Sequence, residues 1–337
     1  MTTSLTLGVQ AERLEYRNPF RISGYVFDKL DCVVVTLSDG VHSGRGEGDG
    51  VYYLDDRQPQ MLADLERERG AIEAGPNRAE LRKILPPGGA RNAVDAALWE
   101  LDAKRTGKPV WALAGLEQPR PVVTTFTLGA DDPAVMAQKA VSFGPIKAIK
   151  VKLTGDLDLD IARVAAIRAA RPDVWLGVDA NQGFAIGELD ALVAAMVAAK
   201  VSLIEQPLAR GREADLDGYT SPIPLAADES ALTLDDVPAL VGRFDVVNIK
   251  LDKCGGLTEG LMIARAARAA GLGVMVGNMG GSTLSMAPSF LLGQVCDICD
   301  LDGPIFLAND RDPAIRYEEG TAWCDERIWG RESLVPA

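Results

Sequence analysis

The feature that most constrains the fold is a regular series of short apolar segments, each ending at a polar or charged residue. From Pro121 onward these β-branched segments alternate with alanine-rich helical stretches such as 161–170, 188–199 and 257–270. Eight of them recur about every 22 to 28 residues, a spacing that fits a (β/α) barrel better than an open sheet. The segments end near Thr127, Lys152, Asp179, Glu205, Asp228, Lys250, Asn278 and Asp300.

The residues before this series have a different pattern. Residues 4–40 indicate strands, of which 31–37 is β-branched and ends at a Ser-Asp-Gly turn. Residues 56–105 indicate helices, and Val94, Leu98 and Leu101 recur at helical spacing. The sequence therefore predicts an α+β domain over residues 1–116 and a barrel over residues 117–306. The segment 307–337 leaves the barrel rhythm and is expected to return to the first domain.

Composition excludes several classes of function. The 337 residues carry a net charge of −13, whereas a protein that binds duplex nucleic acid needs a basic surface. No apolar run approaches the roughly 18 residues that cross a bilayer, and the first residues lack signal-peptide character, so we expect a cytoplasmic protein without a membrane partner. Five scattered cysteines do not suggest a disulfide framework, and a single histidine leaves little basis for Ser-His or Cys-His catalysis.

Three acidic residues end neighbouring strands of the expected barrel. Asp179, Glu205 and Asp228 would meet at the barrel mouth, where barrel enzymes carry their chemistry. Each carboxylate alone could cap a helix or pair with a lysine, but three together would repel one another without a cation. Oxygen ligands without histidine or cysteine favour Mg²⁺, with Mn²⁺ as the alternative.

Lysines flank this carboxylate group. Lys150 and Lys152 are two residues apart on one strand, so both project to the same face. Two close ammonium groups disfavour each other's protonation, which predicts a lowered lysine pKa suited to a general base. Lys250 lies four strands further along an eight-stranded ring, across the barrel from Lys152. A substrate bound between them would have a lysine on either side.

These motifs resemble the muconate-lactonizing subgroup of the enolase superfamily. The similarity covers nearly the whole chain, and it implies a modified (β/α)7β barrel with an α+β N-terminal capping domain. An early Gly-x-Gly-Glu turn at 44–47 and a capping-domain helix at 93–101 also match. The barrel motifs are Ile149-Lys150-Val151-Lys152, Val178-Asp179-Ala180-Asn181, Ile204-Glu205-Gln206-Pro207, Ala227-Asp228-Glu229-Ser230 and the segment 248–256.

The resemblance implies a role for each strand-end residue. The three carboxylates would bind Mg²⁺, which neutralises the enediolate formed when the carbon next to a substrate carboxylate loses its proton. Lys152 and Lys250 would be the acid/base pair, and Lys150 would tune Lys152. Asn181 and Glu229 would orient these groups.

The eighth strand narrows the substrate. Asp300-Leu301-Asp302-Gly303-Pro304 resembles a signature of dipeptide epimerases, in which two carboxylates hold the ammonium of the N-terminal amino acid. We therefore expect an isomerase that epimerises a dipeptide such as L-Ala-D/L-Glu at its C-terminal residue. Further substrate contacts are expected from Thr125, Ser282, Arg21 and Tyr25, and the protein is expected to form a homo-oligomer.

Other functions remain open at this stage. An N-acyl amino acid racemase or a muconate cycloisomerase would share the metal and the lysines, but its substrate has no ammonium to pair with Asp300 and Asp302. A non-catalytic barrel has no need of the lysines and the carboxylates. A metal hydrolase on a barrel usually has histidine ligands.

Overall fold

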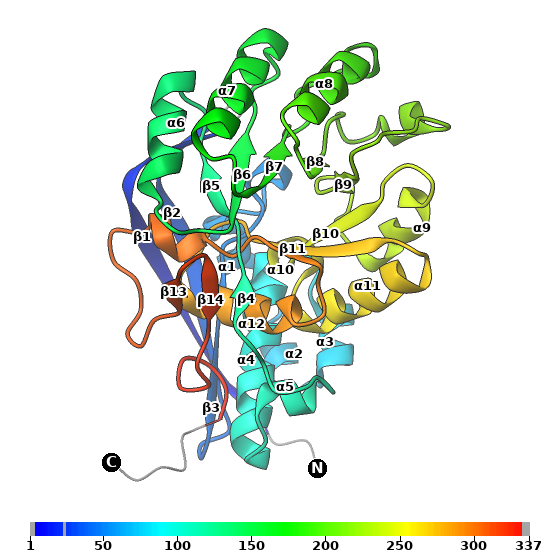
Figure 1. The fold of residues 1–337 in the computed structure, drawn as a ribbon. Helices are drawn as coiled ribbons and strands as arrows, with labels where there is room; N and C mark the ends of the chain where they lie inside the picture. The colour runs from blue at the N-terminus through cyan, green and yellow to red at the C-terminus, as the bar shows by residue number, and fades with distance from the viewer. Residues whose placement is uncertain (1–3, 23–24, 332–337) are drawn as a thin grey trace.

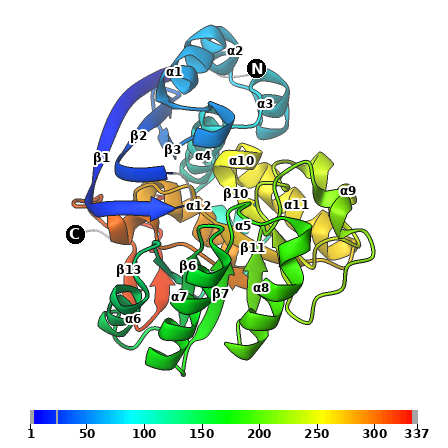
Figure 2. The ribbon, with the colours of Figure 1, turned by 90° about the horizontal axis from the view of Figure 1, so that it is seen from above.

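The structure is a computed structural model that describes residues 4–22 and 25–331, with the side chains of residues 20–25 outside the description. A ring of parallel strands and an antiparallel sheet with its own helices lie against each other (Figure 1). Viewed from above, strands β1 and β2 and helices α1–α3 lie on one side of the ring (Figure 2). No helix of the described residues is long and apolar enough to cross a membrane.

The ring contains eight parallel strands in the order β12-β11-β10-β9-β8-β7-β6-β5, so each strand pairs with its neighbour in sequence. Its two ends meet where the Thr125 N–H donates to the Cys299 carbonyl at 3.0 Å. The fold class predicted from the sequence is confirmed, and each strand ends within about one residue of the predicted position. The strands are β5 (Phe126–Leu128), β6 (Ala148–Lys152), β7 (Trp175–Asp179), β8 (Leu203–Glu205), β9 (Leu225–Ala227), β10 (Val246–Lys250), β11 (Gly273–Gly277) and β12 (Ile298–Cys299).

Helices connect these strands because parallel neighbours need a crossover connection. Leucine, valine and isoleucine side chains of the helices and strands form one large core. The helices are α6 (Pro133–Ser142), α7 (Leu157–Ala170), α8 (Ile186–Ala198), α9 (Val237–Leu240), α10 (Leu251–Cys254), α11 (Leu257–Ala269) and α12 (Thr283–Gly293), with the 3₁₀ turns η2 (Glu213–Leu216), η3 (Leu234–Asp236) and η4 (Gly303–Phe306).

The N-terminal part, which we call the cap, has a second core between a three-stranded antiparallel sheet and helix α4. The Gly-x-Gly-Glu segment, expected as a turn, is in fact strand β3. A Cβ at Gly46 would lie 2.1 Å from the Ala93 carbonyl, so glycine lets the α4 backbone rest on this strand. The elements are β1 (Thr6–Ile22), β2 (Tyr25–Ser38), β3 (Ser43–Gly48), η1 (Tyr52–Leu54), α1 (Gln58–Arg67), α2 (Arg69–Glu73), α3 (Arg78–Ile84), α4 (Gly89–Thr106) and α5 (Val110–Leu113).

The last part of the chain forms a small sheet and then runs to the cap. Strands β13 (Arg316–Glu318) and β14 (Thr321–Trp323) pair with β4 (Val122–Val123). Beyond them, the Trp329 indole N–H donates to the Arg45 carbonyl at 3.1 Å, and the Arg45 guanidinium donates to the Ile328 carbonyl at 2.7 Å. The division of the chain at residues 116 and 306 stays a prediction.

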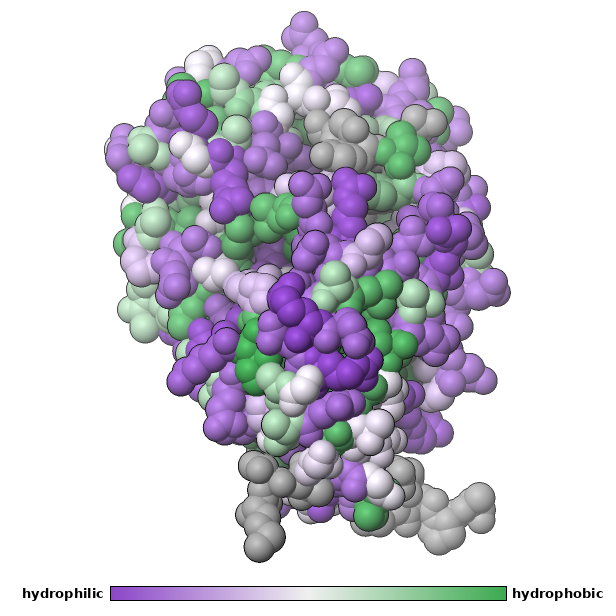
Figure 3. Space-filling view, turned by 180° about the vertical axis from the view of Figure 1, so that it is seen from behind, coloured by the Kyte–Doolittle hydropathy of each residue, from purple (hydrophilic) through white to green (hydrophobic). Residues whose placement is uncertain are grey.

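Hydrophilic residues cover much of the surface (Figure 3). On the face opposite to that of Figure 1, apolar side chains lie scattered among hydrophilic ones (Figure 3).

Candidate active site

The functional side chains lie where the barrel strands end. Lys152, Asp179 and Glu205 are partners in the strand register, so they form one row across β6, β7 and β8. Asp228 follows directly after β9, and Lys250 is the last residue of β10. All five side chains are buried. Charged groups can be buried in this way only when opposite charges or a bound ion compensate for their lost hydration.

The three carboxylates converge. One oxygen each of Asp179, Glu205 and Asp228 lies within 4.8 Å of the other two. The second oxygen of Glu205, Oε1, is held by the Asn248 side-chain amide at 2.7 Å. Three oxygen ligands, with no nitrogen or sulfur among them, fit Mg²⁺ or Mn²⁺. The residues present therefore fit the metal that the sequence predicts.

Two lysines approach this group from different strands. The Lys152 ammonium lies 2.6 Å from Asp179 Oδ2, and the Lys250 ammonium lies 2.6 Å from Asp228 Oδ2. The strand order separates β6 from β10 by three intervening strands. A molecule bound between them would meet an ammonium or amine on each side, as the sequence predicts.

Lys150 has a different environment from the one expected. Its ammonium contacts Asp300 and lies 3.2 Å from Glu205 and 3.5 Å from Asp179. Burial alone would lower the pKa of Lys150, but these carboxylates hold it well above its ordinary value. Lys150 therefore carries a positive charge that three carboxylates stabilise, and the lowered pKa expected for a lysine general base stays a prediction.

The carboxylates differ in charge state for the same reason. Burial and the neighbouring Asp179 carboxylate raise the pKa of Glu205 to about 8. Burial opposes ionisation of Asp228 as well, but Lys250 and Lys253 hold its pKa well below the ordinary value. A cation bound among the three carboxylates would lower the pKa of Glu205.

Sequence reasoning missed Lys253, although it lies inside a matching motif. Its ammonium donates to Asp228 Oδ1 at 2.6 Å, to the Asp228 carbonyl at 2.6 Å and to the Asn248 carbonyl at 2.9 Å. All three donors of this buried side chain are therefore used within the protein. Its neighbour Asp252 accepts from the backbone N–H of Asp49 and of Gly50 in the cap. Only the fold reveals that Lys253 contacts Asp228 and that Asp252 contacts the cap, because the partners lie far apart in the sequence.

Asp300 and Asp302 lie just beyond β12 and differ in their contacts. Besides contacting Lys150, Asp300 accepts a hydrogen bond from the Thr125 hydroxyl at 2.6 Å. Asp302 accepts from the Thr127 backbone N–H at 2.7 Å. Burial and the Asp300 carboxylate raise the pKa of Asp302 to about 7. Asp300 thus already has a cation, whereas Asp302 is the carboxylate that a ligand ammonium would stabilise.

The remaining predicted residues occupy three kinds of position. Asn181 and Glu229 line the cavity beside the carboxylate group, and Asn181 Oδ1 and Glu229 Oε2 are buried oxygens for which the described residues provide no hydrogen bond. Thr125 and Ser282 are buried and do not line the cavity. Thr125 donates to Asp300, and Ser282 binds Glu47 at the start of α12; their contact with a substrate stays a prediction. The side chains of Arg21 and Tyr25 lie outside the described residues.

A cavity of about 750 Å³ lies between the strand ends and the cap. Gly280 in the loop after β11 approaches the cap closely, since a Cβ there would lie 3.0 Å from the Tyr16 hydroxyl. The cap residues lining the cavity include Tyr16, Val26, Phe27, Leu30, Tyr52 and Tyr53, and Phe306 lines it from the barrel side. Sequence reasoning missed most of these cap residues, because their position over the cavity depends on contacts between distant elements.

Family models match both parts of the chain. Residues 4–115 match the mandelate racemase / muconate lactonizing enzyme N-terminal domain, and residues 133–318 match the enolase C-terminal domain-like family. The chain belongs to the enolase superfamily. The resemblance stated from the sequence motifs is thereby confirmed.

Two relatives place the chain among racemases and epimerases. It is 37% identical to the L-Ala-D/L-Glu epimerase of Escherichia coli K12, over 94% of this chain and 98% of the relative. It is 42% identical to an N-acetyl-D-glutamate racemase of a Pseudoalteromonas species, over 72% of this chain and 76% of the relative. The prediction of an isomerase is confirmed.

Solved structures agree. An enolase family member from Agrobacterium tumefaciens with homology to dipeptide epimerases, which holds sodium and L-Ala-L-Glu, superposes with a TM-score of 0.93 at 37% identity, covering 97% of this chain and 100% of that one. A dipeptide epimerase from Enterococcus faecalis, complexed with Mg and L-Leu-L-Tyr, gives a TM-score of 0.86 at 29% identity, with 93% of each chain covered.

Proposed function

We propose that the protein is a Mg²⁺-dependent dipeptide epimerase that inverts the α-carbon of the C-terminal residue of its substrate. The observation that carries this proposal is the pair Lys152 and Lys250 on different sides of the carboxylate triad. The relatives that hold dipeptides, one of them with Mg, support the same assignment.

The two lysines would divide the proton transfer. An uncharged Lys152 or Lys250 removes the α-proton from one face, and the protonated lysine opposite delivers a proton to the other face, which gives the epimer. Mg²⁺ bound by Asp179, Glu205 and Asp228 would neutralise the charge that develops on the substrate carboxylate. Lys150 would add a second positive charge near the substrate carboxylate. The intermediate between the two transfers is an enediolate.

The carboxylate of Asp302 would select dipeptides by binding their ammonium group. The role of Asp300 in binding the ammonium would be indirect, because Lys150 and Thr125 already occupy the Asp300 carboxylate. We propose L-Ala-D/L-Glu as the substrate, on the strength of the E. coli relative and of the L-Ala-L-Glu complex. Arg21 and Tyr25 stay predicted contacts for the second side chain, and a cytoplasmic location and a homo-oligomeric state stay predictions from the sequence.

An N-acyl amino acid racemase is the second candidate, favoured by the 42% identity to the N-acetyl-D-glutamate racemase. It would use the same lysines and metal ligands. Its substrate lacks an ammonium and would leave the buried Asp302 carboxylate without a positively charged partner. Dipeptide epimerisation accounts for Asp302, and N-acyl racemisation does not.

A dipeptide library incubated with the enzyme and Mg²⁺ in D₂O tests the proposal. We expect deuterium at the C-terminal α-carbon together with epimerisation, both read by mass spectrometry after chiral separation. Lys152→Ala and Lys250→Ala should each lower epimerisation by roughly 100- to 10,000-fold, while exchange of one epimer can persist through the remaining lysine. Lys147→Ala, which removes an exposed lysine five residues earlier than Lys152, is the matched control. Near-normal epimerisation by either site variant would contradict the two-lysine mechanism.

A further inference from the structure

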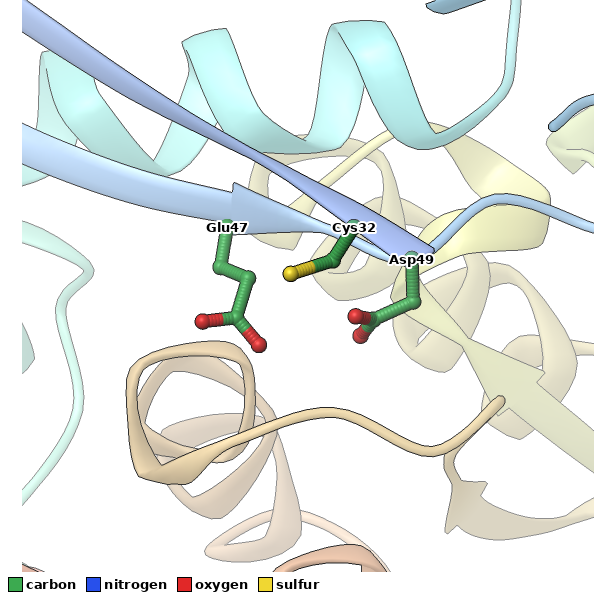
Figure 4. A group of neighbouring side chains, drawn as sticks. All are labelled: Cys32, Glu47 and Asp49. Atoms are coloured by element: carbon green, nitrogen blue, oxygen red, sulfur yellow. The ribbon is translucent and has the colours of Figure 1, made fainter. Parts of the chain in front are cut away.

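A second group of metal-ligand side chains lies between the cap and helix α12. Cys32 on β2, Glu47 on β3 and Asp49 just after β3 each offer one ligand atom, and these atoms lie within 4.8 Å of one another. Figure 4 shows the Cys32 sulfur between the two carboxylates. The three residues are 0%, 1% and 7% exposed, and none of them belongs to the barrel-mouth triad.

Glu47 is fully bonded in this group. The Ser282 N–H donates to Glu47 Oε1 at 2.7 Å, and the Ser282 hydroxyl and the Arg311 guanidinium donate to Oε2. Its charge is thus balanced by a guanidinium and by the N-terminus of α12. Glu47 therefore has a structural reason to be buried that requires no ion.

Asp49 has no comparable reason. Its Oδ2 accepts a hydrogen bond from the Ser285 hydroxyl at 2.8 Å, but Oδ1 is buried and finds no hydrogen-bond donor among the described residues. A buried carboxylate oxygen without a donor is destabilising, because nothing replaces the hydration that it has lost. Oδ1 therefore needs a hydrogen-bond donor or a cation that the described residues do not supply.

The surrounding charges favour a cation. Burial, with Glu47 and Asp252 nearby, raises the pKa of Asp49 well above its ordinary value. Burial, with Glu47 and Asp49 nearby, likewise raises the pKa of the Cys32 thiol. Arg311 opposes both effects with a single positive charge. A divalent ion between the three side chains would reverse them, because it stabilises both thiolate and carboxylate.

We propose that Cys32 Sγ, Glu47 and Asp49 Oδ1 form a second cation site, for a divalent ion that accepts sulfur as well as oxygen, such as Zn²⁺ or Co²⁺. Mixed sulfur and oxygen ligands suit these ions, whereas Mg²⁺ prefers oxygen alone, so the two sites would select different metals. Binding forms a metal–sulfur bond, breaks the Cys32 S–H bond and releases its proton to solvent. The ion can enter from the active-site cavity, which Asp49 lines.

Titration of the metal-stripped full-length protein with Co²⁺, in excess Mg²⁺, tests this site. We expect a thiolate-to-Co²⁺ charge-transfer band that saturates at one equivalent. The band should disappear in Cys32→Ser, and Asp49→Asn should weaken Co²⁺ binding by more than roughly tenfold. Cys299→Ser, which alters another buried cysteine, should keep the band.

The absence of the band in the wild type, or its persistence in Cys32→Ser, would overturn the proposal and leave a proton on Asp49. Thermal unfolding provides a second measurement in case Cys32→Ser does not fold. Zn²⁺ should raise the Tm of the Mg²⁺-saturated wild type more than that of Asp49→Asn, in which the amide can still accept the bond from Ser285. Equal shifts in the two proteins would also refute the site.

Discussion

Replacing Asp302 with asparagine separates the electrostatic role of this carboxylate from its structural role. The asparagine oxygen can still accept the bond from the Thr127 N–H, which is 2.7 Å long in the wild type. What is lost is the negative charge of a side chain that is only 3% exposed. Asp300 cannot replace it, because Lys150 and Thr125 already hold that carboxylate.

The expected loss follows from the burial of the pair. Losing one partner of a buried, hydrogen-bonded charge pair costs about 2–5 kcal/mol. Since about 1.4 kcal/mol corresponds to a factor of ten, this range is roughly 30-fold to several thousand-fold. We expect kcat/KM for L-Ala-L-Glu to fall by at least about 30-fold.

The assay is epimerisation in D₂O, followed by mass spectrometry, for L-Ala-L-Glu and for N-acetyl-L-glutamate. The variant should lose its preference for the dipeptide, because the N-acetyl compound has no ammonium to pair. Asp158→Asn, at an exposed position, controls for the loss of one negative charge. A fall of less than about threefold, or equal falls for both compounds, would refute the ammonium-binding role of Asp302.

Three further outcomes are expected. The pKa of Asp302, about 7, predicts that kcat/KM for a dipeptide declines as the pH falls below that value. The reason is that protonation removes the charge that binds the ammonium. A pH profile of Asp302→Asn should lack this decline. Lys253→Met should destabilise the metal-free protein by about 3–5 kcal/mol in urea unfolding, because it leaves Asp228 without this ammonium. Mg²⁺ should raise the Tm of this variant more than that of the wild type, because the ion would compensate the Asp228 charge. An unchanged stability would contradict this expectation. Gly46→Ala should lower the free energy of unfolding by about 1–3 kcal/mol or more, because its Cβ would lie 2.1 Å from the Ala93 carbonyl. Gly70→Ala is the control: with no atom within 4 Å of the added Cβ, it should change the free energy of unfolding little in the same measurement.

The barrel could be predicted from the sequence because each strand carries its own signal. A β-branched segment that ends at Lys152, Asp179 or Glu205 marks both a strand and the point where the chain reaches the barrel mouth. The strand order then places these residues side by side with no further information. Charged residues at the ends of buried strands thus predict both the fold and the position of the candidate site.

Contacts between distant elements could not be predicted in the same way. Lys150 meets Asp300 across the intervening strand β5, and no local sequence pattern indicates that contact. The cap wall of the cavity depends on how the β1–β2 ribbon twists over the barrel. The pairing of Glu47 with Ser282 at the start of α12 likewise joins segments far apart in the sequence.

The adjacent residues Asp252 and Lys253 make the short helix α10 a joint between two parts of the molecule. One side chain holds the backbone of Asp49 and Gly50, and the other holds Asp228. Anyone grafting a foreign cap onto this barrel to change substrate choice would therefore have to transplant the 49–50 loop in register with Asp252. A chimera that ignores this joint would disturb Asp228, a proposed metal ligand, even though no barrel residue had been altered.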